Sequence, residues 1–270
     1  MSKLPSYTSG PSTKPLIGMT IGDKFDEIAA TYPNNDALIV RHQGIRLTYA
    51  ELKTRVDEAA RAFLAIGVKR GDRVGMWSPN CAQWTITQFA TAKVGAILVN
   101  VNPAYRLHEL EYAMNQSEAK FLVTADSFKT SNYTQMLYDL APELKSCAEG
   151  ELESEKLPHL KGIINLADDK LDGMWRWADF VEMAEKIDNS QLEKIQAELQ
   201  FDDPINIQYT SGTTGFPKGA ALSHHNILNN GYFVAESMNF TDQDRLVIPV
   251  PLYHCFGMVM GNLGCMTHGA

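Results

Sequence analysis

Cysteine is scarce in this chain, and its positions exclude a disulfide framework. Among 270 residues the four cysteines are far apart and form no C-x-x-C pair: Cys81, Cys147, Cys255 and Cys265. Scattered cysteines of this kind are typical of proteins kept in a reducing compartment. The first residues also lack the apolar core of a secretory signal and the arginines of a mitochondrial transit peptide. The sequence therefore favours a cytoplasmic protein.

Positive charge is in deficit. Lysine and arginine number 24 against 32 aspartates and glutamates, which gives a net charge of −8 and a pI near 5.4. Proteins that bind nucleic acids generally need basic patches, so we expect no nucleic-acid partner. A nucleotide is still compatible with this charge, because one local site can be positive inside an acidic surface.

Formal charge is absent from residues 246–270. A stretch of this length can span a membrane. However, Pro249, Pro251 and several glycines interrupt it, and these residues disfavour one continuous helix. We therefore expect a strand, a loop and a buried helix here, and no transmembrane segment.

What the sequence does contain is a dense run of hydroxyl, glycine and lysine residues at positions 210–219. The run reads T-S-G-T-T-G-F-P-K-G, with four hydroxyl side chains, three glycines and one lysine. Glycines let the backbone approach a ligand closely, and consecutive N–H groups form a concave site for anions. Hydroxyl groups add donors, and lysine adds a positive charge suited to phosphate. The expected ligand is a polyphosphate.

Two other phosphate-binding patterns are absent. A Walker loop needs G-x-x-x-x-G-K-[ST], whereas Gly212 and Gly215 are three positions apart and Lys218 precedes Gly219. No G-x-G-x-x-G follows an early strand, so a Rossmann dinucleotide-binding protein is disfavoured. The structural alternative is a glycine-rich hairpin without a ligand, which would need neither the four hydroxyl groups nor the lysine.

The run resembles the phosphate-binding signature of the adenylate-forming enzymes, which include acyl-CoA synthetases, coumarate ligases, luciferases and peptide-synthetase adenylation domains. It matches T-S-G-T-T-G-x-P-K-G without a mismatch. The resemblance implies that this run holds the β- and γ-phosphates of ATP and that Thr210 faces Mg²⁺. The nucleotide-binding residues implied in this way are Thr210, Ser211, Gly212, Thr213, Thr214, Gly215 and Lys218.

A second segment, residues 251–257, reads P-L-Y-H-C-F-G and resembles the P-x-x-H-x-x-G motif of acyl- and aryl-CoA ligases. In that family an aromatic residue or a histidine at this place borders the carboxylate pocket and the nucleotide. The resemblance thus implies that His254 binds substrate and that Lys218 and His254 are catalytic. A lone histidine beside aromatic residues is otherwise more often a core residue with satisfied hydrogen bonds.

Weaker matches extend the resemblance from about Thr20 to Ala270. They are R-L-T-Y-A-E-L at residues 46–52, G-D-R-V at residues 71–74 and A-K-V-G-A at residues 92–96, followed by N-P. Each has a purely structural role available, and their order and spacing carry the resemblance. Within the family, the lead-in and residues 102–105 look most like medium-chain fatty-acyl-CoA ligases.

Strands alternate with helices along the sequence, which predicts an α/β fold with largely parallel sheets. Strands are expected at residues 37–40, 45–47, 72–77, 96–101, 121–124, 162–166, 205–209 and 220–222. Helices are expected at residues 20–32, 48–66, 80–94, 107–116, 133–140 and 223–230, with one or two more within 175–200 and a charged surface loop at 143–156. We divide the chain into an irregular lead-in (1–19), a first α/β subdomain (20–200) and the start of a second that carries the phosphate loop (201–270).

The resemblance implies an AMP-forming acid–thiol ligase that uses ATP, Mg²⁺ and coenzyme A to activate a medium- or long-chain fatty acid. The family's later segments have no match, so we expect the front half of such a ligase, with its large domain incomplete at the C-terminus. The alternative is a non-catalytic or split half-domain that binds nucleotide only with a partner chain. The acyl chain length, the choice between fatty and aryl acids and the oligomeric state are left open, and a homo-oligomer is compatible with the sequence.

Overall fold

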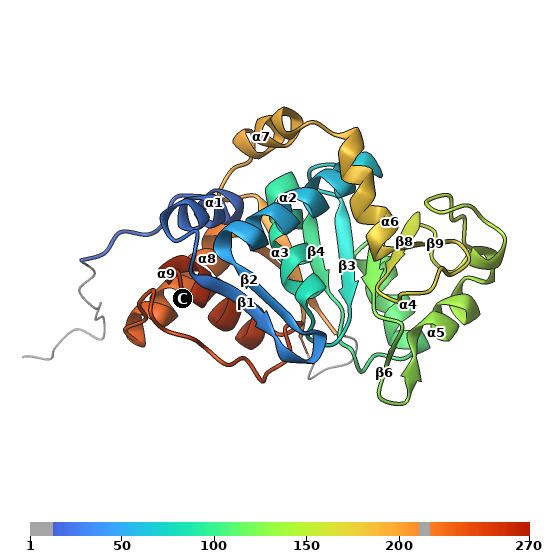
Figure 1. The fold of residues 1–270 in the computed structure, drawn as a ribbon. Coiled ribbons are helices and arrows are strands. Elements are labelled where there is room, and N and C mark those ends of the chain that lie inside the picture. The colour runs from blue at the N-terminus through green and yellow to red at the C-terminus, as the bar shows by residue number, and fades with distance from the viewer. Residues whose placement is uncertain (1–12, 211–216) are drawn as a thin grey trace, which may run out of the picture.

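The structure is a computed structural model that describes residues 13–210 and 217–270. A seven-stranded sheet runs through the middle of the molecule in the order β11-β10-β4-β3-β5-β8-β9 (Figure 1). Neighbouring strands are parallel except for β10 and β11, which are antiparallel. The strands are β3 (Arg73–Trp77), β4 (Ile97–Asn100), β5 (Phe121–Thr124), β8 (Gly162–Asn165), β9 (Met174–Arg176), β10 (Pro204–Tyr209) and β11 (Gly219–Ser223). The expected α/β fold with a largely parallel sheet is confirmed.

Alternate side chains of the strands enter two separate apolar cores, as the two-residue period of a strand requires. Val74 and Met76 of β3 belong to the first core, whereas Val99 of β4 and Leu122 of β5 belong to the second. The first core is covered by α1 (Ile21–Thr31), α2 (Tyr49–Ala65) and α3 (Ala82–Val94). The second is covered by α4 (Leu107–Gln116), α5 (Tyr133–Leu140) and the short η2 (Pro142–Lys145).

The later helices all add side chains to the first core. They are α6 (Trp177–Glu182), η3 (Met183–Lys186), α7 (Asn189–Ala197), α8 (His224–Ser237), η4 (Phe256–Leu263) and α9 (Gly264–His268). The helix η4 has π-helical winding. It packs against α8 at Gly231, where an added Cβ would lie 2.9 Å from the carbonyl oxygen of Val259. A side chain at this position would therefore separate the two helices.

Two short antiparallel ribbons lie outside the main sheet. One pairs β1 (Asp36–Val40) with β2 (Ile45–Thr48) through the turn η1 (Arg41–Gln43), and the other pairs β6 (Ser127–Phe128) with β7 (Ser131–Asn132). The Asp36 carboxylate binds Arg46 at 2.6 Å and Arg245 at 3.1 Å. This bridge ties the first ribbon to the segment that precedes η4.

Buried ion pairs connect the first three helices. The Nζ atom of Lys93 in α3, whose side chain is 2% exposed, lies 2.7 Å from Asp26 Oδ1 of α1 and also contacts Asp57 of α2. Lys53 of α2 shares both carboxylates. Burial raises the pKa of Asp26, but Lys93, a hydrogen bond from Gln196 and the charge of Lys53 together outweigh it and hold that pKa below its usual range. Lys93, which is the lysine of the A-K-V-G-A segment, thus has a structural role, because it joins α1, α2 and α3.

Several boundaries follow local signals in the sequence. The Thr48 side chain accepts from Glu51 N–H, and the Glu51 carboxylate accepts from Thr48 N–H at 2.8 Å, which forms a capping box at the start of α2. Gly95 ends α3 with a φ of +71°. An added Cβ there would lie 2.6 Å from Leu199 Cδ2, so conformation and close packing both favour glycine.

Other expectations are wrong. The strand expected within residues 246–270 does not form, although the structure describes all of these residues. The Val250 carbonyl accepts from the side chain of Asn80 and not from a neighbouring strand. The helix capped by Ser223 continues to Ser237, beyond the expected end at residue 230. Strand β9 was not expected, and its last two residues fall in the range 175–200, for which only helices were expected. Three residues are too few to show an alternating pattern.

The charged stretch at residues 143–156 is anchored to the protein. Its loop carries Leu144 and Leu152, both fully buried in the second core. The proposed boundary near residue 200 stays a prediction. Strands from either side of it, β4 and β10, are direct neighbours in one sheet.

Candidate active site

The hairpin of β10 and β11 brings together the two ends of the glycine-rich run. Tyr209 and Gly219 are paired across the strands, and the next backbone N–H, that of Thr210, donates to the Lys218 carbonyl at 3.0 Å. The side chains of Thr210 and Lys218 are both exposed. The other predicted nucleotide-binding residues lie outside the described residues: Ser211, Gly212, Thr213, Thr214 and Gly215.

Helix α4 contacts the hairpin at Tyr209 of β10 and at Pro217, two residues before β11. The Tyr209 hydroxyl donates to the Ala113 carbonyl at 2.9 Å, and the Tyr112 hydroxyl donates to the Pro217 carbonyl at 3.2 Å. Burial raises the pKa of Tyr209 to about 12, so its hydroxyl stays a donor at neutral pH. We call the hairpin of β10 and β11 the phosphate hairpin, after its predicted ligand. Its base is fixed to a helix that packs on the sheet.

The His254 segment, residues 250–258, folds as a tight turn leading into η4. The His254 N–H donates to the Pro251 carbonyl at 3.2 Å, and the His254 carbonyl accepts from Gly257 N–H at 3.0 Å. An added Cβ on Gly257 would lie 2.6 Å from the Pro251 carbonyl oxygen. Both the proline and the glycine of the P-x-x-H-x-x-G pattern thus take part in one close contact.

The imidazole of His254 is exposed, which contradicts the alternative of a buried core histidine. Its Nδ1 accepts the backbone N–H of Phe256 at 3.2 Å and lies 3.6 Å from Cys255 Sγ. Because a backbone N–H can only donate, Nδ1 must be unprotonated there. In the neutral ring the proton is therefore on Nε2, and this nitrogen is a donor.

The phosphate hairpin and His254 lie at the same edge of the sheet. Strand β4 ends at Asn100, which is in register with Gln208 of the parallel strand β10, two residues before Thr210. The Asn100 side chain donates to the Tyr253 carbonyl at 2.9 Å, directly before His254. Ligands of open α/β sheets bind at this carboxyl edge. The structure thus brings Thr210, Lys218 and His254 to one edge.

Amide side chains missed by the sequence analysis hold the His254 segment. Asn80 donates to the Val250 carbonyl at 2.9 Å and accepts from Leu252 N–H at 2.7 Å. Gln88 donates to the Met258 carbonyl at 3.3 Å. Asn80 could have been found by its place shortly after the carboxyl end of β3, which ends at Trp77. Gln88 lies inside α3 and carried no such signal.

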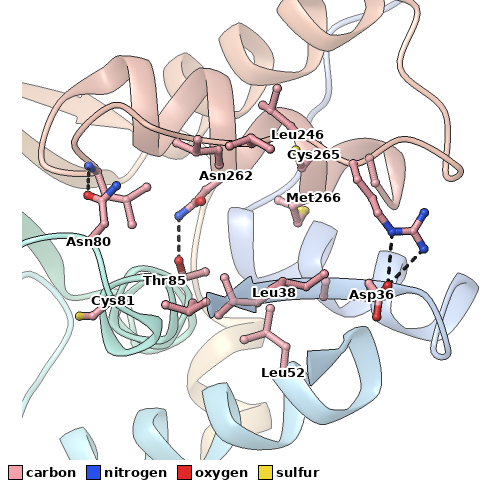
Figure 2. Close-up of a pocket in the computed structure, with 18 of the residues that line it drawn as sticks. Asp36, Leu38, Leu52, Asn80, Cys81, Thr85, Leu246, Asn262, Cys265 and Met266 are labelled. Carbon is pink, nitrogen blue, oxygen red and sulfur yellow. Dashed lines mark hydrogen bonds and ion pairs between the residues drawn. The ribbon is translucent and has the colours of Figure 1, made fainter. Parts of the chain in front are cut away.

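A cavity of about 590 Å³ lies beside this segment, between the β1–β2 ribbon and the last helices (Figure 2). Its wall is mainly apolar and includes Leu38, Leu52 and Phe89, with Asp36 and Arg245 among the charged residues. Asn262 crosses from η4 to Thr85 with a bond of 3.1 Å. None of the predicted site residues that the structure describes lines this cavity.

A protein-built metal centre is not present among residues 13–210 and 217–270, where no group of three or more histidine, cysteine or acidic residues could hold an ion. No helix in the same ranges is both long and apolar enough to cross a membrane.

The family model for AMP-binding enzymes matches residues 25–270. The chain belongs to the AMP-binding enzyme family. It is 43% identical over 255 residues to a putative acyl-CoA synthetase of Bacillus subtilis, YngI, covering 94% of this chain and 46% of that protein. It is 44% identical over 270 residues to the mitochondrial medium-chain acyl-CoA ligase ACSF2 of Mus musculus, covering 98% of this chain and 44% of that protein.

Solved structures of AMP-binding enzymes share the fold. Apo MbtA of Mycobacterium smegmatis has a TM-score of 0.76 at 25% identity, over 94% of this chain and 43% of that one. The anthranilate CoA ligase AuaEII, in complex with anthranoyl-AMP, has a TM-score of 0.77 at 20% identity, over 95% and 45%. The chain thus spans less than half the length of the curated relatives described here.

Proposed function

We propose that this AMP-binding family member takes part in the ATP-dependent activation of a medium- or long-chain fatty acid, first to an acyl-adenylate and then to an acyl-CoA thioester. The observation that carries the proposal is the meeting of the phosphate hairpin and the His254 segment at one sheet edge. Relatives named acyl-CoA synthetase and medium-chain acyl-CoA ligase support it. The alternative of a non-catalytic half-domain gains no support from these relatives.

In the first step a carboxylate oxygen attacks the α-phosphorus of ATP, the acyl-adenylate forms and pyrophosphate leaves. In the second, the sulfur of coenzyme A attacks the acyl carbon and AMP leaves. Two anions must approach one another in the first step, so positive charge and N–H or O–H donors must offset the charge on the phosphates. Lys218 and the backbone and hydroxyl groups of Ser211, Thr213 and Thr214 are our candidates for this role, with Gly212 and Gly215 giving the backbone close access.

Magnesium fits the donors at the end of β10, since a hard cation prefers oxygen ligands and the Thr210 hydroxyl is exposed there. We propose that Thr210 would hold the ion. The ion would supply charge that offsets the polyphosphate. His254 would bind the fatty acid, because its Nε2–H can donate to a carboxylate oxygen.

The test is ATP–pyrophosphate exchange by the protein purified from its native source, with a series of saturated fatty acids and an aryl acid. Exchange that depends on a fatty acid, followed by AMP and thioester formation when coenzyme A is added, supports the proposal. Exchange with the aryl acid alone would reject the fatty-acid assignment. No exchange with any acid would reject adenylation.

The compartment and the oligomeric state are tested separately. The scattered cysteines favour a cytoplasmic protein, whereas the mouse relative is named mitochondrial. Subcellular fractionation distinguishes the two locations. The oligomeric state was left open by the sequence, and light scattering after size-exclusion chromatography measures it.

A further inference from the structure

One buried side chain joins the peptide before His254 to the central sheet. Asn100, the last residue of β4, is 1% exposed. Its Nδ2 donates to the Tyr253 carbonyl at 2.9 Å and contacts Met258 Sδ at 3.2 Å. Its Oδ1 accepts from Asn206 Nδ2 of β10 at 2.9 Å. Both ends of the Asn100 amide are therefore engaged.

The direction of this chain of amides is fixed by its ends. Asn206 Nδ2 also donates to the Leu98 carbonyl at 2.9 Å, and a carbonyl can only accept. Asn206 must therefore present its NH₂ group to Asn100, which receives it on Oδ1. Asn100 in turn presents its own NH₂ group to the Tyr253 carbonyl. Hydrogen bonds thus run one way, from β10 through β4 to the His254 segment.

Asn100 holds the peptide group that directly precedes His254. The Tyr253 carbonyl belongs to the peptide bond that joins Tyr253 to His254, so holding it fixes the plane from which the histidine departs. The N–H and carbonyl of His254 bond within the segment, to Pro251 and to Gly257 and Met258. Asn80 and Gln88 hold the segment on either side of this peptide, at Val250, Leu252 and Met258.

We propose that Asn100 is a positioning residue that sets where His254 presents its Nε2–H to the substrate carboxylate. The proposal rests on the proposed function and extends it, because it assigns Asn100 to acid binding and leaves ATP binding to the hairpin. A displacement of about 1 Å at a reacting group can cost roughly a hundredfold in rate. A small shift of the Tyr253 peptide is therefore enough to matter.

Two variants separate the hydrogen bond from the packing. Asn100→Asp keeps the shape and the acceptor for Asn206 but replaces the donor with an oxygen, which can donate to Tyr253 only when protonated. Asn100→Leu removes both groups. The matched controls are Asn165→Asp and Asn165→Leu, because Asn165 is also 1% exposed and ends the parallel strand β8. The Asn165 side chain donates to the Thr134 hydroxyl and accepts from Ala167 N–H, and neither partner belongs to the His254 segment.

Cys255 provides a readout that needs no enzyme activity. It is the exposed cysteine next to His254, whereas the other three are partly buried. Its reaction rate with 5,5′-dithiobis(2-nitrobenzoate) is measured in the native full chain, with a Cys255→Ser variant to subtract the other thiols. We expect Asn100→Asp to raise this rate at least threefold relative to the unmodified protein at neutral pH. The ratio of the Cys255 rate in Asn100→Asp to that in the unmodified protein should return toward one as the introduced carboxyl group is protonated. In both Asn165 variants the corresponding ratio should stay near one.

The kinetic readout is pyrophosphate exchange by the same proteins. We expect Asn100→Asp to raise the KM for the fatty acid about tenfold at neutral pH while the KM for ATP changes less than twofold. An unchanged Cys255 rate, or a changed rate with an unchanged acid KM, overturns the proposal. Absence of exchange in the unmodified protein overturns the proposed function, and the assigned role of His254 with it. The Cys255 rates still decide in that case whether Asn100 places the segment.

Discussion

At the scale of single residues, Lys218 is where the proposed chemistry depends most on one charge. Charge-assisted hydrogen bonds contribute roughly 1.5–3 kcal/mol. We therefore expect Lys218→Ala to slow fatty-acid-dependent pyrophosphate exchange by about tenfold to a few hundredfold, at about 1.4 kcal/mol per factor of ten. Lys194→Ala is the control, because Lys194 is an exposed lysine on α7. An unchanged exchange rate in Lys218→Ala would contradict the assigned role.

At Gly257 the neighbouring backbone leaves no room for a side chain. The methyl group of Gly257→Ala would meet the Pro251 carbonyl oxygen at 2.6 Å and Leu252 Cα at 3.0 Å, and both are backbone atoms. We expect the free energy of unfolding to fall by about 1–3 kcal/mol, the usual cost of overpacking. Urea denaturation of Gly257→Ala beside Gly18→Ala measures it, since nothing lies within 4 Å of a Cβ at Gly18. Equal stability of the two variants would mean that the turn relaxes without cost.

Local patterns in the sequence point to the candidate site residues Lys218 and His254, but not to the residues that hold them in place. Asn100 is the last residue of β4 and Asn80 follows β3, and neither stands in a distinctive pattern. The partners of Asn100 and Asn80 lie 153 and 170 residues away along the chain. Contacts at that separation arise from the sheet topology, which no local pattern contains.

At the scale of elements, Lys93 holds α1, α2 and α3 together. Removing one partner of a buried ion pair leaves uncompensated charge, at a cost of about 3–5 kcal/mol. We expect Lys93→Met to lower the free energy of unfolding by about 3 kcal/mol, because Lys53 still neutralises part of the charge on Asp26 and Asp57. Thermal unfolding beside Lys194→Met measures the loss. A melting temperature equal to that of the control would show that the methionine packs as well as the ion pairs.

Elements with a clear period were predicted closely, and those without one were not. The bounds of α4, β5 and α5 agree with the expected ranges, since each is a continuous apolar or amphipathic run. The π-helical winding of η4 has no local signal in the sequence, and the contacts of η4 with α8 and with Gln88 of α3 join residues far apart along the chain. Residues 246–250 resemble a strand in composition but lack a paired neighbour among the described residues.

At the scale of the whole molecule, His224 makes the free energy of unfolding depend on pH. It is fully buried at the start of α8, and its Nδ1 accepts the Ile21 N–H at the start of α1, 3.1 Å away. Burial lowers the pKa of His224 to about 4, although the charges of Asp203 and Asp23 oppose the shift. The unfolded chain, with an ordinary value of 6.5, therefore takes up this proton more readily than the folded protein.

The stability linked to His224 is accordingly complete above about pH 6.5 and falls as the pH drops toward 4. The loss is about 3 kcal/mol, at about 1.4 kcal/mol per pKa unit. His224→Asn can still accept the Ile21 N–H without titrating, so its unfolding free energy should depend less on pH in this window. Urea denaturation from pH 4 to 7 compares the two proteins. Parallel pH profiles would exclude His224 as the cause.

The insertion of β10 beside β4 has a consequence for the order of folding. Strands β3, β4, β5 and β8 can pair once residue 165 has emerged from the ribosome, but the outer edge of β4 stays unpaired until Asn206 emerges and pairs with Leu98. Until then the nascent chain presents an unpaired strand edge, which invites association with other chains. Asn100, Tyr253 and the phosphate hairpin can meet only after that edge is closed. We therefore expect the candidate site to assemble last, and the interval before β10 emerges from the ribosome to be the time at which a chaperone matters most.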